Sequence, residues 1–360
     1  MHVAFDASVV QTRLKGAGRV LVNLAAAMPR VDPSRRYSTL AFPNGAEVLR
    51  DAGMETEIVE VSAMSGLSWE MYGLANAASA LGADVVFTLR EIVSGGGPPT
   101  VLHLAEAPAY RLRSDLRLRP AKHIAKDVLL QALLRRSIRH AAVVTAASEA
   151  TASWLGRRYG IDPPVIPPGI DLFFLEVGAR SDAEPYLLHP ATGDRRENTD
   201  LVLRAYAAST PPAALVLVGT PVQEQEPIAV RARALGIAPN DIRIHGWVSD
   251  EELLALYRGA VALVHPARFE GFAGLQPLEA MAQGTPVIAL EAPGVTEALS
   301  DVAILVAEDP VALGAAMRQL ATDEHACAEW GDRGRAFARA FTWERAAGSF
   351  VQVFDELARA

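Results

Sequence analysis

Cysteine is almost absent from the sequence, and long apolar runs are missing altogether. The single cysteine among the 360 residues, Cys327, excludes an intramolecular disulfide. No stretch approaches the roughly 20 consecutive apolar residues that are needed to cross a bilayer. The opening residues, MHVAFDASVV, lack the basic region and long apolar segment of a signal peptide and are typical of a buried first strand. We therefore expect a soluble, cytoplasmic protein.

Lysine is also scarce. The chain has three lysines, Lys15, Lys122 and Lys126, among its 34 basic residues, and none follows position 126. An anion held by a side-chain cation in the second half must therefore be held by arginine or by a charged histidine. The formal net charge of −8 argues against general nucleic-acid binding.

Short β-branched runs alternate with helical patterns along a chain that is long enough for two domains. Continuous apolar strands separated by helices favour parallel sheets that are covered on both faces. Two such sets predict an α/β protein with two doubly wound, Rossmann-like domains. The predicted strands are Val3–Phe5, Tyr37–Phe42, Glu57–Val61, Asp84–Thr88, Thr100–His103, Ala142–Thr145, Tyr186–His189, Ala214–Val218, Ile242–His245, Val261–Val264, Pro286–Leu290 and Ile304–Val306.

A proline-rich run over residues 162–169 separates the two sets of strands. We therefore predict an N-terminal domain over residues 1–170 and a C-terminal domain over residues 171–342. The last helix, predicted over residues 343–360, follows an apparently complete second domain, so we expect it to pack back on the first.

The segment from Val264 to Pro286 carries the clearest chemical pattern: a strand, a glycine-containing loop, a helix, and a Gly-Thr-Pro turn into another strand. Glycines let the main chain approach a ligand closely. A helix that begins near Leu275 offers unpaired amides suited to a diphosphate. Glu279 on that helix could accept hydrogen bonds from ribose hydroxyls, and Glu270 from hydroxyls of an attached sugar. The alternative is a capped loop followed by a glutamate on a surface helix.

This segment resembles the donor-site signature of the family-4 retaining glycosyltransferases, which have the GT-B fold. The resemblance extends along nearly the whole chain. It includes the glycine loop Gly16-Ala17-Gly18, His103, Ser148-Glu149, residues 166–171, residues 245–260 and residues 341–344. The resemblance implies that the N-terminal domain takes the acceptor and the C-terminal domain takes a nucleotide sugar.

Particular roles follow from the resemblance. Gly16 and Gly18 would bring backbone amides to the donor phosphates, or would form an ordinary strand-to-helix turn. Arg195 and Arg196 would neutralise the leaving diphosphate, or would lie in a solvated charged loop. His103 would contact the transferring sugar, or would be a structural histidine.

The resemblance also implies the remaining contacts with the donor, which lie in the C-terminal domain. Glu279 would hold the ribose, while the transferring sugar would be held by Glu270, Gly271, Phe272, Ala273, Gly274 and Leu275. Of all these residues, His103, Arg196 and Glu270 are the implied catalytic ones.

Three features depart from the family pattern. Leu104 follows His103 where an acidic residue is common, although Glu106 is near. Eight residues lie between Glu270 and Glu279 where the family has seven, and Ala273 is the extra one. The insertion must bulge the loop or shift Glu270 outwards. Glu197 follows Arg196 where the family usually has lysine, so its carboxylate would repel a diphosphate unless it turns away or pairs with Arg195.

The sequence has no Asp-x-Asp motif, which fits transfer without a metal ion or another cofactor. The implied reaction moves a hexosyl or deoxyhexosyl unit from a nucleotide diphosphate sugar to a hydroxyl acceptor with retention. The alternatives are an inactive GT-B subunit that binds a nucleotide sugar, and a GT-B nucleotide-sugar epimerase. The base, the sugar, the acceptor and the oligomeric state stay open.

Residues 111–140 form a basic stretch with a net charge of +7, so the remainder of the chain carries −15. One interpretation is peripheral contact with an anionic inner membrane face or attraction of an anionic acceptor. The favoured interpretation is a solvated helix face. Its other side would pack in the core through Val128, Leu129, Ala132 and Leu133.

Overall fold

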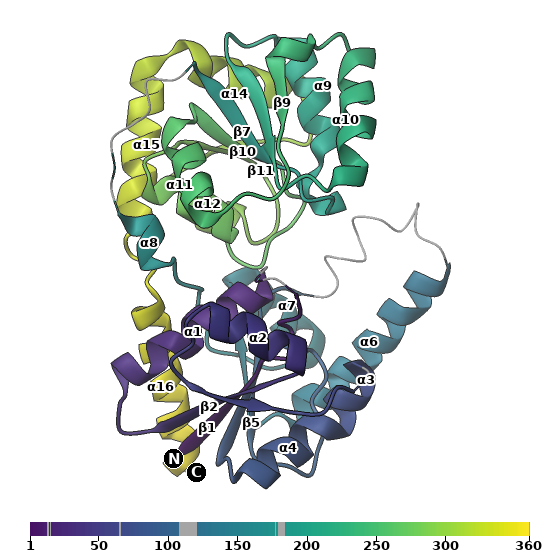
Figure 1. The fold of residues 1–360 in the computed structure, drawn as a ribbon, viewed down its shortest axis with the longest axis vertical. Coiled ribbons are helices and arrows are strands. Elements are labelled where there is room, and N and C mark those ends of the chain that lie inside the picture. The colour runs from purple at the N-terminus through teal and green to yellow at the C-terminus, as the bar shows by residue number, and fades with distance from the viewer. Residues whose placement is uncertain are drawn as a thin grey trace. The chain divides into compact units, whose positions relative to one another are not determined.

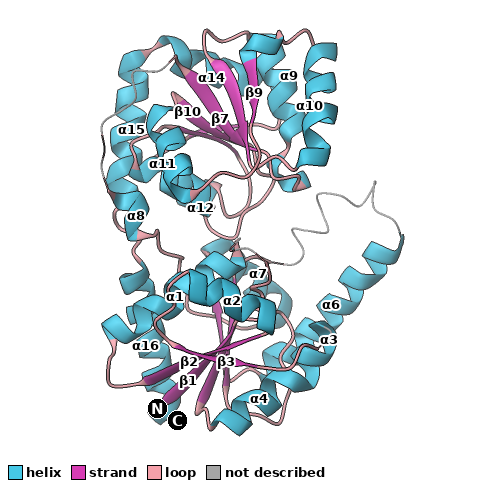
Figure 2. Ribbon diagram, viewed as in Figure 1, coloured by secondary structure: helices cyan, strands magenta, loops and turns pink. Residues whose placement is uncertain are grey.

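The computed structural model describes residues 1–12, 14, 16–64, 66–107, 121–176, 178 and 184–359 (Figure 1). The chain forms two compact units. One comprises Met1–Gly169 together with Phe341–Ala360, and the other comprises Ile170–Ala340. Each unit is an α/β layer structure with helices on both faces of a parallel sheet (Figure 2).

The N-terminal unit is built on a six-stranded parallel sheet with the order β3-β2-β1-β4-β5-β6. The inner strands β1, β4 and β5 are buried along their whole length, whereas the edge strand β3 begins and ends with an exposed glutamate. The strands are β1 (His2–Asp6), β2 (Arg36–Ala41), β3 (Glu57–Glu60), β4 (Val85–Thr88), β5 (Thr100–Leu104) and β6 (Val143–Ala146).

Helices cover both faces of this sheet. They are α1 (Ala17–Val31), α2 (Pro43–Asp51), α3 (Gly66–Ser68), the π-helix η1 (Trp69–Gly73), α4 (Leu74–Leu81), α6 (Ala121–His140), α7 (Glu149–Tyr159) and α16 (Trp343–Arg359). The C-terminal helix α16 packs against α1, and Arg30 pairs with Glu344 at 2.9 Å between these helices. The end of the chain thus belongs to the N-terminal unit.

The C-terminal unit repeats the same topology with the order β12-β11-β10-β7-β8-β9. Its strands are β7 (Tyr186–Pro190), β8 (Ala214–Val218), β9 (Ile242–Ile244), β10 (Ala262–His265), β11 (Val287–Leu290) and β12 (Ile304–Val306). In both units the first and fourth strands lie side by side, and the chain order reverses between them. Such a switch point is where open α/β sheets bind ligands, beyond the carboxyl ends of the strands.

Several helices of this unit begin with side-chain caps. Ser249 and Glu252 form a capping box at α11, and the Asp309 carboxylate accepts from Ala312 N at the start of α14. The helical elements are α8 (Leu172–Leu175), the 3-10 helix η2 (Arg195–Glu197), α9 (Thr199–Ser209), α10 (Val222–Ala234), the 3-10 helix η3 (Pro239–Asp241), α11 (Asp250–Gly259), α12 (Leu275–Ala282), α13 (Thr296–Leu299), α14 (Pro310–Thr322) and α15 (Glu324–Ala338).

The predicted fold class is confirmed, since each predicted strand overlaps an observed one and both sheets are parallel. One packing prediction is wrong. Leu129 is 53% exposed and Ala132 is also exposed, whereas Leu134 is fully buried beside Ile138. The core stripe of α6 is therefore rotated from the one predicted.

Within the basic stretch, residues 111–120 lie outside the described residues, as do the side chains of Lys122 and Lys126. Arg135, Arg136 and Arg139 are exposed on α6. In the part of the chain that the structure covers, no helix is both long enough and apolar enough to cross a membrane.

Candidate donor-binding site

The predicted donor residues of the C-terminal unit gather at its switch point. The loop at residues 191–198 follows β7, and the loop at residues 266–274 follows the neighbouring β10. Arg268 N donates to Arg196 O at 3.3 Å, which joins the two loops. The topology therefore brings together arginines and glutamates that are about 75 residues apart in the sequence.

Glu270 is held from two sides. Its Oε1 accepts a hydrogen bond from Nε2 of His265 at 3.0 Å, and its backbone N donates to Pro293 O at 3.1 Å. The side chain of His265 is 5% exposed and that of Glu270 is 19% exposed, so solvent screens this contact only partly. The carboxylate is fixed in place while it stays accessible to a ligand. Sequence reasoning missed His265, whose role is visible only once β10 ends at this residue.

The extra residue Ala273 is absorbed as a bulge. Ala273 has a φ of 49° and Gly274 a φ of 92°, so two consecutive residues adopt left-handed backbone angles. Ala273 is fully buried, and its N donates to Gly294 O at 3.0 Å. A Cβ on Gly294 would overlap the carbonyl oxygen of Glu270. The loop bulges inwards against residues 293–294, and Glu270 keeps its contact with His265.

Gly274 is packed directly against the His265–Glu270 pair. A Cβ on Gly274 would lie 3.2 Å from Nε2 of His265 and 3.4 Å from Cδ of Glu270. Helix α12 starts immediately afterwards, and no side chain of the described residues caps it. The amides of its first turn thus face the carboxyl edge of the sheet, where an anion would be stabilised.

Glu279 is 4% exposed, and its Oε2 accepts a hydrogen bond from the Tyr257 hydroxyl at 2.9 Å. The alternative of a surface glutamate is therefore wrong. A buried carboxylate that already has one donor can take further donors such as ribose hydroxyls. Tyr257, on α11, is a second residue that sequence reasoning missed.

Arg195 and Arg196 lie in η2. Arg195 is exposed. The guanidinium of Arg196 binds the Asp194 carboxylate at 2.8 Å and stacks over the Phe269 ring at 5.4 Å. Arg196 is thus oriented by both loops, whereas the exposed side chain of Arg195 makes no such contact with the residues that the structure describes.

Glu197 turns back onto its own loop. Its Oε2 accepts from Thr192 N at 2.7 Å, and its Oε1 accepts from the Thr192 hydroxyl at 2.6 Å. Burial raises the pKa of Glu197 to about 7, although both hydrogen bonds from Thr192 act in the opposite direction. Of the two predicted arrangements, the structure shows the first, because the carboxylate turns onto Thr192, although its charge stays within the loop that carries Arg196.

A polar network extends the site to a third strand. Glu308, which follows β12, accepts from Nε of Arg268 at 2.8 Å and from the Asn198 amide at 3.0 Å. Asn198 has a φ of 55° and begins α9. No sequence spacing connects these three residues, because they come from three different strand ends.

His103 lies near the carboxyl end of β5 in the N-terminal unit and is 3% exposed. Its Nδ1 is 2.9 Å from the Thr145 hydroxyl, and its ring packs against Phe87 and Phe350. Burial lowers the pKa of His103 to about 4, so the imidazole is neutral at pH 7. These contacts give His103 a structural role in the core of the N-terminal unit. Its contact with the transferring sugar stays a prediction.

Gly16 and Gly18 also lie in the N-terminal unit. Gly16 precedes α1 with a φ of 39°, and a Cβ there would meet no atom within 4 Å. Gly18 is buried, and a Cβ on it would lie 3.6 Å from Val10. Gly16 is therefore required by its backbone angle and not by crowding. The predicted contact of both glycines with donor phosphates stays a prediction.

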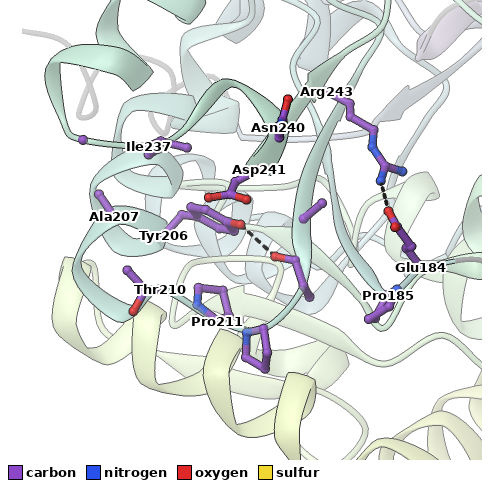
Figure 3. A pocket seen from close by; sticks show the side chains of 14 residues that line it. Glu184, Pro185, Tyr206, Ala207, Thr210, Pro211, Ile237, Asn240, Asp241 and Arg243 are labelled. Atoms are coloured by element: carbon purple, nitrogen blue, oxygen red, sulfur yellow. Dashed lines mark hydrogen bonds and ion pairs between the residues drawn. The ribbon is translucent and has the colours of Figure 1, made fainter.

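The C-terminal unit also contains a cavity of about 460 Å³ (Figure 3). It is lined by residues that precede β7, β8 and β9, among them Glu184, Ala213 and Asp241. Arg243 pairs with Glu184 at 2.8 Å across its rim. This cavity lies at the amino ends of the strands, the opposite edge of the sheet from the donor site.

No three His, Cys, Asp or Glu side chains gather as metal ligands in the described ranges. The site offers arginines, helix amides and carboxylates instead. Such a set can bind a diphosphate and the hydroxyls of a nucleotide sugar.

Solved glycosyltransferase structures share the fold. Sucrose-phosphate synthase from Thermosynechococcus elongatus matches with a TM-score of 0.81 at 19% identity, over 99% of each chain. The Anabaena protein HepE, solved with UDP and glucose, matches with a TM-score of 0.76 at 19% identity, over 99% of this chain and 100% of that chain. The fold is therefore GT-B.

Sequence profiles match both units. The family described as Glycosyltransferase Family 4 matches residues 14–173, and the family described as Glycosyl transferases group 1 matches residues 174–337. The chain belongs to the family-4 glycosyltransferases.

Individual relatives match parts of the chain. D-inositol 3-phosphate glycosyltransferase from Xylanimonas cellulosilytica is 30% identical over 59% of this chain and 56% of the relative. The enzyme of the same name from Acidothermus cellulolyticus is 31% identical over 62% of this chain and 56% of the relative. O-antigen chain mannosyltransferase B from Escherichia coli is 33% identical over 32% of this chain and 30% of the relative. The chain thus spans little more than half the length of the first two relatives.

Proposed function

We propose that this glycosyltransferase moves a hexosyl or deoxyhexosyl unit from a nucleotide diphosphate sugar to a hydroxyl acceptor with retention at the anomeric carbon. The observation that carries the proposal is the Glu270 loop, where His265 fixes the carboxylate immediately before the uncapped start of α12. Retention is inferred from the resemblance to the retaining enzymes of the family.

In this proposal the residues of the C-terminal unit act mainly by binding charge. Arg196 and the first amides of α12 would stabilise the departing diphosphate, and Arg195 would add long-range attraction. Glu279 would accept from the ribose, and Glu270 would accept from the transferring sugar. No covalent nucleophile is assigned. His103, being neutral at pH 7, would act as a hydrogen-bonding partner and not as a proton donor.

The proposal is tested by nucleotide release. The protein is incubated with UDP-, GDP-, ADP- and dTDP-sugars and with a panel of hydroxyl acceptors. D-inositol 3-phosphate belongs in that panel because the relatives are named for it. Release of nucleotide that requires one donor and one acceptor supports the proposal. Retention is then read from the anomeric configuration of the product by NMR, and an inverted product contradicts it.

Transfer without a metal ion belongs to the same proposal. We expect release to continue at an unchanged rate in excess EDTA, because arginines and helix amides take the role of a cation. A loss of release in EDTA that Mg²⁺ or Mn²⁺ restores would contradict this part alone.

An inactive subunit that binds a nucleotide sugar is the second candidate. Glu197 favours it, because a carboxylate occupies the position where the family usually has a cationic lysine. Saturable binding of a donor without release, even with every acceptor in the panel, would support this candidate.

A further inference from the structure

We propose that Glu197 is a positioning residue, whose carboxylate closes the loop at residues 192–197 onto Thr192 and so fixes Arg196 for the donor diphosphate. This inference rests on the proposed function, because it assumes that Arg196 faces a diphosphate. It assigns a use to the residue that departs most clearly from the family pattern.

The hydrogen bonds between Glu197 and Thr192 form a closed clamp. Both carboxylate oxygens are used, one by the amide and one by the hydroxyl of Thr192, at 2.7 and 2.6 Å. The loop between them turns at Gly193, with a φ of 85°, and ends at Asn198, with a φ of 55°. Left-handed angles at both places let a short segment double back, and the clamp holds it in that shape.

Thr192 is itself anchored to the neighbouring strand. A Cβ on Gly219, which follows β8, would lie 3.1 Å from Cγ2 of Thr192, so the methyl group rests on the backbone there. The φ of Gly219 is 80°, which favours glycine at this place. The clamp therefore ties η2 to a fixed part of the sheet edge.

Arg196 depends on this arrangement. Its backbone N donates to the Asp194 carboxylate at 2.9 Å, and its carbonyl accepts from Arg268 N at 3.3 Å. Its guanidinium is set by Asp194 and by the Phe269 ring. Because Glu197 is the next residue in the same 3-10 turn, release of the clamp would free the backbone that carries Arg196.

The charge of Glu197 is separable from the clamp. Asp194 and His265 are the charged and titratable neighbours that act on it, the first raising and the second lowering its pKa, while burial is the largest cause and raises it to about 7. In either protonation state one oxygen can accept from Thr192 N and the other can share a hydrogen bond with the Thr192 hydroxyl. A glutamine can make the same two contacts without charge.

Four variants distinguish a positioning role of Glu197 from the simple loss of the family's cationic lysine. E197Q and T192S retain both hydrogen bonds, and below pH 7, where Glu197 is protonated, we expect the KM for the donor to stay within about twofold of wild type. E197K and T192V remove one or both bonds, and we expect the KM to rise roughly tenfold with a smaller change in kcat. If the site instead lacks the family's lysine, E197K lowers the donor KM, and that result overturns the proposal. A rise in the donor KM of E197Q as large as that of E197K also overturns the proposal.

The pH profile gives a readout that a merely structural role would not move. An ionised Glu197 beside the diphosphate weakens donor binding, so the wild-type affinity should fall as pH rises through about 7, while that of E197Q stays flat. An intact nucleotide sugar is used because its diphosphate does not titrate near neutrality. Parallel profiles of the two proteins would overturn the placement of Glu197 beside the donor.

Hydrogen exchange in the free protein tests the clamp independently of donor binding. We expect the amides of residues 192–197 to exchange at least roughly tenfold faster in E197A than in wild type or E197Q. Equal exchange in all three proteins overturns the clamp. If the exchange result is as expected but no nucleotide sugar binds wild type, the clamp stands and the proposed function fails.

Discussion

At the scale of single residues, the site is distinguished by partly or fully buried carboxylates that are hydrogen-bonded. Glu279 accepts from Tyr257, Glu270 from His265, and Glu197 from Thr192. A carboxylate has about four acceptor sites, so one that is held by one or two donors keeps acceptor capacity for sugar hydroxyls. Each of these pairs can be broken without introducing a new charge.

Removal of the Tyr257 hydroxyl tests the Glu279 pair. We expect Y257F to lower the free energy of unfolding by about 1.5–3 kcal/mol, because a buried carboxylate loses a hydrogen bond. The measurement is urea unfolding followed by circular dichroism. Y206F is the matched control, because the Tyr206 hydroxyl donates to a neutral carbonyl, that of Ala213, at 2.8 Å. We expect the donor KM to rise in Y257F and not in Y206F. A similar rise in both variants would contradict a donor role for Glu279.

The raised pKa of Glu197 predicts a pH dependence of stability. A carboxyl group whose pKa rises from 4.5 to about 7 on folding stabilises the protein fully below pH 4.5, and this contribution is lost as pH rises through about 7. E197Q does not titrate. The melting temperature of wild type relative to E197Q should therefore fall between pH 5 and pH 8. A constant difference across this range would show that Glu197 keeps its ordinary pKa.

At the scale of elements, the loop between β10 and α12 is the part that makes the site. It contains one residue more than the family pattern, and the excess is taken up by left-handed angles at Ala273 and Gly274. Two backbone hydrogen bonds to residues 293–294 hold the bulge from the other side. The position of Glu270 thus depends on a neighbouring turn as well as on its own loop.

A substitution at Gly294 tests whether the turn at residues 293–294 positions Glu270. We expect G294A to lower kcat/KM roughly tenfold or more, because its Cβ would overlap the Glu270 carbonyl and displace the loop. Steady-state kinetics and thermal unfolding are measured together. G236A is the control, since Gly236 has a φ of 83° against 78° for Gly294 but no atom within 4 Å of its Cβ. Equal losses of activity in both variants would indicate backbone strain and not displacement of Glu270.

At the scale of the whole molecule, two copies of one topology supply two switch points. Much of this could be predicted from sequence, because buried parallel strands appear as continuous apolar runs such as Ala214–Val218. The location of the predicted donor loops follows from the same pattern, since polar residues after β7 and β10 must meet at one edge. The topology alone is enough for that inference.

The contacts within the site could not be predicted in the same way. His265, Tyr257 and Glu308 reach the predicted donor loops through side-chain contacts between different elements, and no spacing in the sequence marks such contacts. The core face of α6 was wrongly predicted because Leu129 and Leu134 are both leucines and only packing distinguishes them. Local pattern gives the elements, and tertiary contacts decide which side chains meet.

The central claim is that the C-terminal unit binds a nucleotide diphosphate sugar through Arg196 and the start of α12. The most direct measurement is the thermal unfolding of wild type and R196A with the panel of UDP-, GDP-, ADP- and dTDP-sugars. A ligand at about 100 times its Kd stabilises the native state by about 2.7 kcal/mol. We predict that one donor raises the Tm of wild type by several degrees and that R196A loses most of this rise. No rise with any donor, or an equal rise in R196A, would contradict the claim.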